Sequence, residues 1–259
     1  MTIRTDLQYK NGAVHVRDHG RTDTREQLPE LKGTDLLSSD QWGQSWKREA
    51  GVHSNDPALN SLAESQASIA RTFEAYGKIR SQQSPEQTQF AHLKSVANDL
   101  DTALRGLATR SDSAQESAKA RLESIDREFK DSIGWRGEDS GELRAVLRGM
   151  SQADRQEIVG NAIESGDGQV LAAVLGAHPT LSGMTADQHS NARARTMLKH
   201  RPDLRKLEQS LHKASAQTRQ SYIDLLDRSD VISARYIRDK YQKSAIEAAA
   251  ARQNAAEHY

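Results

Sequence analysis

The strongest candidate for chemistry in this sequence is a stretch of basic side chains in the C-terminal third. Cations at this density could contact the phosphates of a nucleic acid or the carboxylates of an acidic partner. The stretch is bounded by only two acidic residues, Asp187 and Asp203, and no aromatic residue is interleaved for stacking on bases. The candidate contacts are Arg193, Arg195, Lys199, Arg201, Arg205 and Lys206.

The charge of the whole chain argues against a surface covered in positive charge. The sequence holds 36 basic and 36 acidic residues. Residues 186–259 have 14 basic and 9 acidic side chains, a surplus of five, whereas residues 54–185 have 14 and 19, a deficit of five. The two regions therefore have complementary signs, which suits head-to-tail contact between copies as well as it suits nucleic acid.

Two tryptophans provide a second kind of candidate site. Trp42 and Trp46 lie one turn apart on the same side of a short helix expected after Asp40. Tryptophan carries a large share of the binding energy when it fills a pocket on a partner. The same pair could instead cover the end of a helical bundle. Both tryptophans are candidate partner contacts, with that alternative open.

The N-terminus has the pattern of a short β-hairpin. Apolar and polar residues alternate on both sides of Asn11-Gly12, a pair that tolerates the positive φ angles of a two-residue turn. A lone hairpin is only marginally stable, so it must dock on something. Tyr9 and Val14 are therefore candidates for contact with a neighbouring subunit, by strand addition. The polar residues that follow predict an extended arm.

No catalytic or metal-binding pattern stands out. The nine histidines show no metal-ligand spacing, and there is no cysteine. Gly166-Asp167-Gly168 lacks the lysine of a phosphate loop and the alternating oxygens of a calcium loop, so we interpret it as a turn between helices. No serine stands in a GxSxG pattern. We expect a protein that is not an enzyme and needs no metal or cofactor.

Long amphipathic helices must position these candidates. Asn55-Asp56-Pro57 predicts a helix start, because an Asp cap precedes proline at the first helical position. A heptad seam follows and predicts a helix to about residue 82: Leu59, Leu62, Gln66, Ile69, Phe73 and Tyr76. The next capping box, Ser84 to Gln87, predicts a second helix, antiparallel to the first.

A second apolar seam follows in this helix: Leu93, Ala97, Leu100, Leu104 and Leu107. The helix could restart at Ser111, so that either a third helix or one bent long helix fits residues 111–133. Gly134 to Gly141 is the clearest break, and shorter helices follow it to about Lys199. Long helices then return, with a polar break at 227–230 and an alanine-rich end, 247–256, which should project or pack on a neighbour.

We therefore expect a mainly all-α fold, a bundle of antiparallel long-helix hairpins with a short N-terminal β-hairpin and an extended arm. The expected divisions are 1–55 for the hairpin and arm, 56–135 for a long-helix hairpin, 136–200 for a small helical bundle, and 201–259 for C-terminal long helices. No apolar run is long enough for a membrane segment.

One segment resembles a known group of proteins. Gly166 to Pro179, GDGQVLAAVLGAHP, continues through LSGMT at 181–185 into the basic helix. About 35 residues are similar to a segment of helical proteins of tailed-bacteriophage genomes whose role is usually unassigned. The resemblance implies a virion or assembly role and assigns no functional residue.

These observations lead to a non-enzymatic structural or assembly subunit of a larger particle, a tailed-phage virion component. Its expected partners are copies of itself and other subunits, reached through helix packing and arm contacts. Its expected location is the cytoplasm during synthesis and then the virion. The alternative is a nucleic-acid-associated accessory protein that uses residues 193–206.

Overall fold

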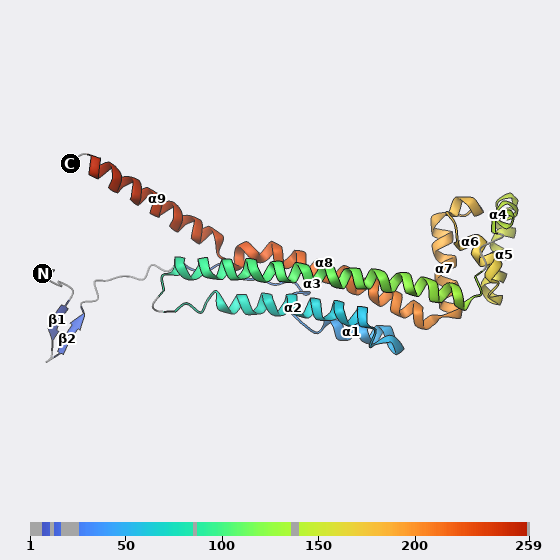
Figure 1. Ribbon diagram of the computed structural model, residues 1–259, viewed down its shortest axis with the longest axis horizontal. Helices are drawn as coiled ribbons and strands as arrows, with labels where there is room; N and C mark the ends of the chain where they lie inside the picture. Colours follow the sequence, from blue (N-terminus) through green and yellow to red (C-terminus); the bar gives the residue numbers. More distant parts are fainter. Residues whose placement is uncertain (1–6, 11–12, 17–25, 85–86, 136–139, 258–259) are drawn as a thin grey trace.

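The computed structural model describes residues 7–10, 13–16, 26–84, 87–135 and 140–257. Helices dominate this part of the chain, as the sequence predicts (Figure 1). Strands β1 (Leu7–Lys10) and β2 (Ala13–Val16) pair antiparallel, with Tyr9 opposite Val14. Because Asn11-Gly12 and residues 17–25 lie outside the described residues, the N-terminal hairpin stays a prediction.

An elongated bundle, which we call the stalk, is built from helices α1 (Trp42–Ala50), α2 (Pro57–Ile79), α3 (Gln89–Ser132) and α8 (Pro202–Ile232). Helices α2, α3 and α8 pack along one another, and α1 covers α2 and α8. A short 3₁₀ helix, η1 (Gly51–His53), joins α1 to α2. Helix α8 is thus part of the stalk, so the predicted segment 201–259 does not stand apart from the hairpin of α2 and α3.

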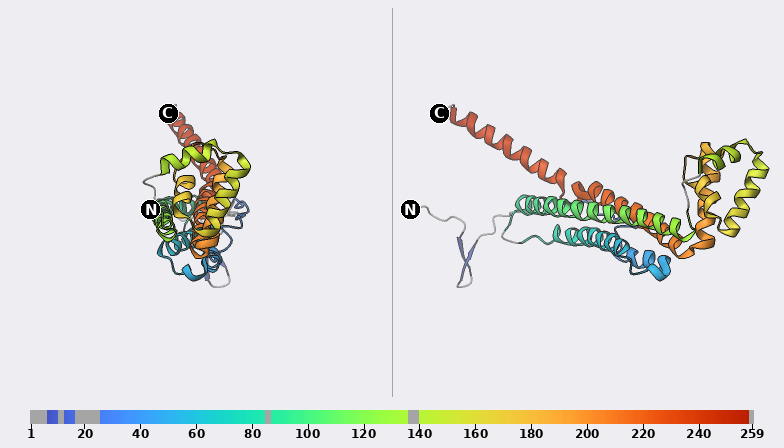
Figure 2. Two further views of the ribbon diagram at one scale, coloured as in Figure 1. Left: turned by 90° about the vertical axis from the view of Figure 1, so that its right-hand side faces the viewer. Right: turned by 45° about the vertical axis from the view of Figure 1, so that its right-hand side comes forward.

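A cluster of shorter helices, which we call the head, sits at one end of the stalk (Figure 1). It contains α4 (Ser140–Gly149), α5 (Gln152–Ser165), α6 (Gly168–Leu175), the 3₁₀ helix η2 (Pro179–Ser182) and α7 (Ala186–His200). At the opposite end, α9 (Arg235–Glu257) diverges from the bundle in both views of Figure 2.

The predicted start of the first long helix is confirmed. The Asp56 carboxylate accepts hydrogen bonds from the backbone N–H of Ala58, at 3.0 Å, and of Leu59, at 3.4 Å, and Pro57 is the first helical residue. The second helix begins later than predicted: Thr88, not Ser84, caps it, by accepting from the N–H of Ala91.

Of the two alternatives for residues 111–133, the structure has one helix, because α3 continues without interruption through Ser111 for 44 residues in all. Ser111 is buried there, with Ala114 and Ala118 following on the same inner face. Small side chains on this stripe let neighbouring helices approach closely, and that packing favours continuing the helix over ending it. The resulting helix is about 66 Å long at 1.5 Å per residue.

The predicted break at 227–230 is wrong. Helix α8 passes through these residues to Ile232, because Leu225 and Ile232, seven residues apart, both lie in the core and the polar side chains between them face outward. The chain bends instead at Ala234, which is buried and has a positive φ of 45°.

The apolar core runs from the stalk into the head without interruption. One cluster includes Trp46 and Leu62 in the stalk and continues through Phe129 to Leu147 and Leu171 in the head. A second cluster, around Ile69, Leu100 and Leu225, fills the middle of the stalk. A third, around Leu93 and Ile237, holds the first turns of α9.

The turn at Gly166-Asp167-Gly168 has the structural role that its sequence indicates. Gly166 has a φ of 73° and ends α5, and the Asp167 carboxylate accepts from the N–H groups of Gln169 and Val170 to cap α6. A Cβ atom on Gly168 would lie 2.2 Å from the carbonyl oxygen of Ile133. The second glycine is therefore needed for α6 to pack against the end of α3.

Candidate functional site

The predicted basic stretch lies at the corner between α7 and α8, where the head meets the stalk. Arg193 reaches from α7 to both neighbouring helices: its guanidinium donates to Glu208 Oε1 at 2.6 Å and to Asp126 Oδ1 of α3 at 3.3 Å. Arg205 donates to the other oxygen of Glu208, also at 2.6 Å. Glu208 is buried, so one buried carboxylate holds two half-buried arginines.

The pKa values of this corner follow from its pairing. Burial alone would lower the pKa of Arg193, but the hydrogen bonds to Glu208 and Asp126 raise it overall. Burial alone would raise the pKa of Asp126, and hydrogen bonds from Lys130 and Arg193 bring it below its usual value. These groups are therefore charged and satisfied by one another at neutral pH.

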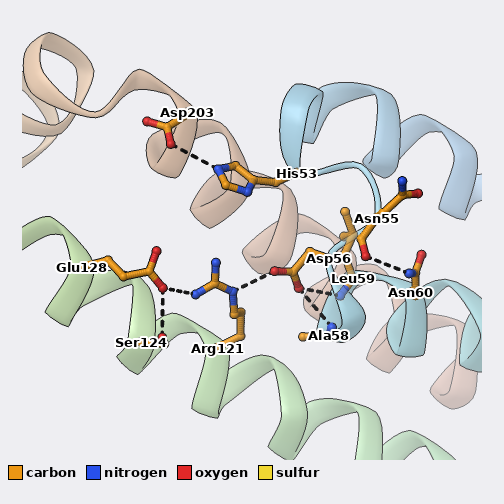
Figure 3. A network of polar contacts seen from close by, with 10 residues as sticks. All are labelled: His53, Asn55, Asp56, Ala58, Leu59, Asn60, Arg121, Ser124, Glu128 and Asp203. Atoms are coloured by element: carbon orange, nitrogen blue, oxygen red, sulfur yellow. Dashed lines mark hydrogen bonds and ion pairs between the residues drawn. The ribbon is translucent and has the colours of Figure 1, made fainter.

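Arg201 and Asp203 form a second pair beside the first. Two guanidinium nitrogens of Arg201 donate to the two oxygens of Asp203, at 3.1 and 2.9 Å. The hydrogen bond from Arg201 holds the pKa of Asp203 well below its usual range, and His53 of η1 contacts the same carboxylate at 3.2 Å. Figure 3 shows the contact between His53 of η1 and Asp203 in the first turn of α8.

A third pair links α3 to the start of α2 (Figure 3). Arg121 donates to the second oxygen of the capping residue Asp56 at 2.7 Å, and it also pairs with Glu128. Burial alone would raise the pKa of Glu128, but the hydrogen bond from Arg121 makes it lower than usual. We call these three groups of ion pairs, centred on Glu208, Asp203 and Arg121, the junction.

The junction uses three of the six cations that the sequence offered as phosphate contacts. Arg193, Arg201 and Arg205 are paired as above, and Lys199 pairs with Glu164 at 2.7 Å on the surface of the head. Arg195 and Lys206 are exposed. The positive surplus of 186–259 and the negative surplus of 54–185 thus meet in part within one chain, where they attach the head to the stalk.

The two tryptophans cover the stalk. Trp46 is fully buried, and its indole N–H donates to Gln217 Oε1 of α8 at 2.6 Å. Trp42 is half-buried against the same core and donates to the carbonyl oxygen of Asp35 at 3.2 Å. The hypothesis that Trp46 anchors a partner is therefore wrong for the folded chain, because its pocket is supplied by the chain itself. The side chains of Tyr9 and Val14 lie outside the described residues, so their proposed contacts stay a prediction.

The described part of the predicted arm is bound to the stalk. We call residues 26–40 the strap. Its backbone is held by side chains along the bundle: Gln89 exchanges two hydrogen bonds with Glu26, Arg80 donates to Pro29, and Arg228 donates to Lys32. Leu37 of the strap is buried. This part of the arm is consequently not free to grip a neighbouring subunit.

The end of α9 has the opposite character. Its first two turns pack on the bundle through Ile237, which is fully buried, and Tyr241, which meets Phe90 edge to face. Every side chain from Gln242 to Asn254 is exposed, including Ile246 at 63%. We call residues 242–254 the distal helix. It matches the prediction that the alanine-rich end projects or packs on a neighbour.

A groove of about 330 Å³ lies between α5 and α7 in the head, and no motif in the sequence predicts it. Val159, Ile163 and Ala192 form an apolar floor, and Gln156, Asn191 and Arg195 are among the polar residues that line it. The one signal in the sequence was Gly160, which lines the groove from the interior of a helix, where glycine costs about 1 kcal/mol relative to alanine.

Among the residues that the structure describes, no three His, Cys, Asp or Glu side chains converge as metal ligands. Within the same part of the chain, no helix combines the length and the apolar character needed to cross a bilayer. No family model matches the sequence, and no curated protein or solved structure is significantly similar to it.

Proposed function

We propose that this chain is a non-enzymatic assembly subunit that carries its contact surface at the ends of a stiff stalk. The observation that carries the proposal is the distal helix, a continuation of α9 whose side chains are exposed beyond the packed bundle. An amphipathic or alanine-rich helix of this length gains most of its stability from packing against a partner. An exposed helix that extends beyond the bundle is therefore what we expect of a subunit that binds other molecules.

The larger particle that we propose is a tailed-phage virion, on the resemblance of residues 166–185 and of the basic helix that follows. In this proposal the other partners are copies of the chain and further virion subunits. Strand addition by β1 and β2 remains part of the proposal, through Tyr9 and Val14. The cytoplasm is the proposed site of synthesis and the virion the final location.

The nucleic-acid alternative has less support. A phosphate contact requires cations that are accessible and not already neutralised. Three of the six candidates, Arg193, Arg201 and Arg205, are held in the junction, which leaves Arg195, Lys206 and the surface-paired Lys199. No specific observation favours nucleic acid over an assembly role.

The molar mass of the full chain in solution tests the proposal. We expect light scattering to give a mass above the 28.7 kDa of one chain and to rise with concentration. Neighbouring genes should encode virion components. A chain that stays monomeric at every concentration and is encoded among metabolic genes would contradict the assembly function.

A further inference from the structure

The groove between α5 and α7 has features that contacts within the described chain do not explain. A Cβ atom added to Gly160 would meet no atom within 4 Å. Packing in the described part of the chain therefore does not require glycine there, although glycine weakens the helix. A residue without a side chain, next to an apolar floor, lets another backbone approach closely.

The side chains that line the groove indicate the chemistry of the segment that would bind in it. The floor of Val159, Ile163 and Ala192 is apolar and accepts a medium-sized aliphatic side chain. Arg195 at the groove is exposed, and in the described part of the chain it forms no ion pair; its charge acts on Glu164 only from a distance. The occupant should therefore present an aliphatic residue beside a carboxylate, on a backbone with small side chains.

The distal helix presents this combination. Ile246 is 63% exposed, and Glu247 follows it. Residues 248–251 are four consecutive alanines, whose small side chains allow the axis of the helix to come close to a neighbouring helix. Among the described residues Glu247 forms no ion pair, so its carboxylate is available to a cation on another molecule.

We infer that the distal helix of one copy docks in the α5–α7 groove of a second copy. Ile246 fills the apolar floor, the alanine run crosses Gly160, and Glu247 pairs with Arg195. The inference rests on the proposed assembly function and names the surface and the partner that the assembly uses.

The shape of the chain requires that the contact lie between copies. The head is at one end of α3, a helix about 66 Å long, and α9 leaves the stalk near the other end and points away from it (Figure 1). A distal helix therefore cannot reach its own groove. Because the two surfaces differ, the contact is head to tail, and repeated contacts form an open chain or a closed ring.

Because the groove is small, we expect the affinity of a single contact between two copies to be low. A groove of about 330 Å³ holds only a few side chains, so the interface is smaller than that of a stable dimer. Association should therefore depend on concentration, and in a particle it would be supported by the other contacts of each copy.

Sedimentation velocity of the full chain and its single variants tests the inference. Ile246→Glu removes the aliphatic side chain, and Gly160→Leu fills the groove; each should leave only the monomer at concentrations where the unaltered chain associates. Val52→Glu changes an apolar residue that is 84% exposed on η1, and Gly106→Leu adds the same side chain to an open helical position on α3. These matched controls should associate as the unaltered chain does.

Mixing the two variants gives the sharpest result. The Ile246→Glu copy keeps an intact groove, and the Gly160→Leu copy keeps an intact distal helix. An equimolar mixture should form a one-to-one complex and stop there, because each pair has only one productive contact. Reversing the charges, with Glu247→Arg in one copy and Arg195→Glu in the other, should restore the association that each single reversal weakens.

The contrary outcomes separate this inference from the proposed function. If Gly160→Leu associates like the unaltered chain whereas Ile246→Glu does not, the distal helix assembles through another surface, and the groove is not its site. If both variants associate unchanged, assembly uses neither surface and the inference is overturned. A chain that never associates contradicts the head-to-tail contact and self-assembly together.

Discussion

The junction and the distal helix differ in where their polar side chains lie: those of the junction are paired between helices, and those of the distal helix are exposed. At the junction, Glu208, Arg193 and Arg205 are drawn inward and satisfy one another between three helices. In the distal helix, residues 242–254 stay in contact with solvent. A high density of charge in a sequence therefore does not show that those charges are free to contact a partner. Three arginines of the basic stretch form ion pairs within the chain, whereas the side chains of the alanine-rich distal helix are exposed.

Removing the central carboxylate of the junction should have the largest effect. Glu208→Leu leaves the charges of Arg193 and Arg205 partly buried without their shared partner, and should lower the free energy of unfolding by about 3 kcal/mol. Urea denaturation followed by circular dichroism measures this loss. Glu247→Leu in the distal helix is the matched control and should change stability by less than about 0.5 kcal/mol. Equal effects at the two sites would remove the distinction between the regions.

Acid should weaken the junction before it affects the distal helix. Asp126, Glu128 and Asp203 have pKa values lowered in the folded chain, so the stability they contribute is complete above their unfolded pKa values, near about 4, and is lost as the pH falls toward the folded values. The urea midpoint should therefore be flat from neutral pH down to about pH 5 and fall below about pH 4.

The variant Asp203→Asn isolates one contribution to this acid sensitivity. It should reduce the slope of the urea midpoint below about pH 4, whereas Glu247→Gln, whose parent carboxylate has no ion pair in the described residues, should keep it. A slope that Asp203→Asn leaves unchanged would show that the pairing with Arg201 contributes nothing to the pH dependence.

A substitution at Ala234, which connects α8 of the stalk to α9, should change stability by a smaller amount. Ala234, between α8 and α9, has a φ of 45°, which a residue with a Cβ rarely adopts. Ala234→Gly should relieve this strain and raise the free energy of unfolding by up to about 1 kcal/mol. Ala214→Gly, at a buried position inside α8, should lower it. If both glycines destabilise the chain, the backbone at Ala234 is not strained.

The distal helix itself should show the smallest effect on global stability. Ala249→Gly lowers helix propensity by about 1 kcal/mol locally, but it should leave the global free energy of unfolding unchanged because residues 242–254 unfold separately. Hydrogen exchange of the monomer should show rapid exchange in this segment and slow exchange in α3 and α8. Protection of the distal amides in the monomer would mean that the helix has a partner within its own chain.

Several features that depend on neighbouring residues were predicted correctly from the sequence, although the cap of the second long helix, at Thr88 and not at Ser84, was not. The cap at Asp56 and the turn at Gly166-Asp167-Gly168 are local patterns, and the structure contains both of them. The seams also predicted the all-α bundle, because heptad spacing reports which face of a helix is buried. The projecting end of α9 followed from its lack of large apolar residues.

Features that depend on distant partners could not be read in the same way. Arg193 pairs with Asp126, 67 residues earlier, and Trp46 donates to Gln217, 171 residues later. Nothing in the local pattern distinguishes an arginine that faces a carboxylate across the bundle from one that faces solvent. Two pairs are close enough in the sequence to have indicated that the basic stretch is partly neutralised: Arg201 with Asp203, two residues apart, and Arg205 with Glu208, three residues apart on one helix.

The strap has a consequence for the order in which the chain can fold. Its binding partners include Asp224 and Arg228 of α8 and Tyr236 of α9, which contact strap residues about 190 to 210 positions earlier in the sequence. During synthesis the strap leaves the ribosome long before these helices exist, so it can at first contact only α2 and α3, through residues such as Arg80 and Gln89. The contacts of the strap with α8 and α9 therefore form last, and a ribosome-bound chain that lacks α8 leaves the cluster around Leu37 without the part that Leu225 and Ile232 supply.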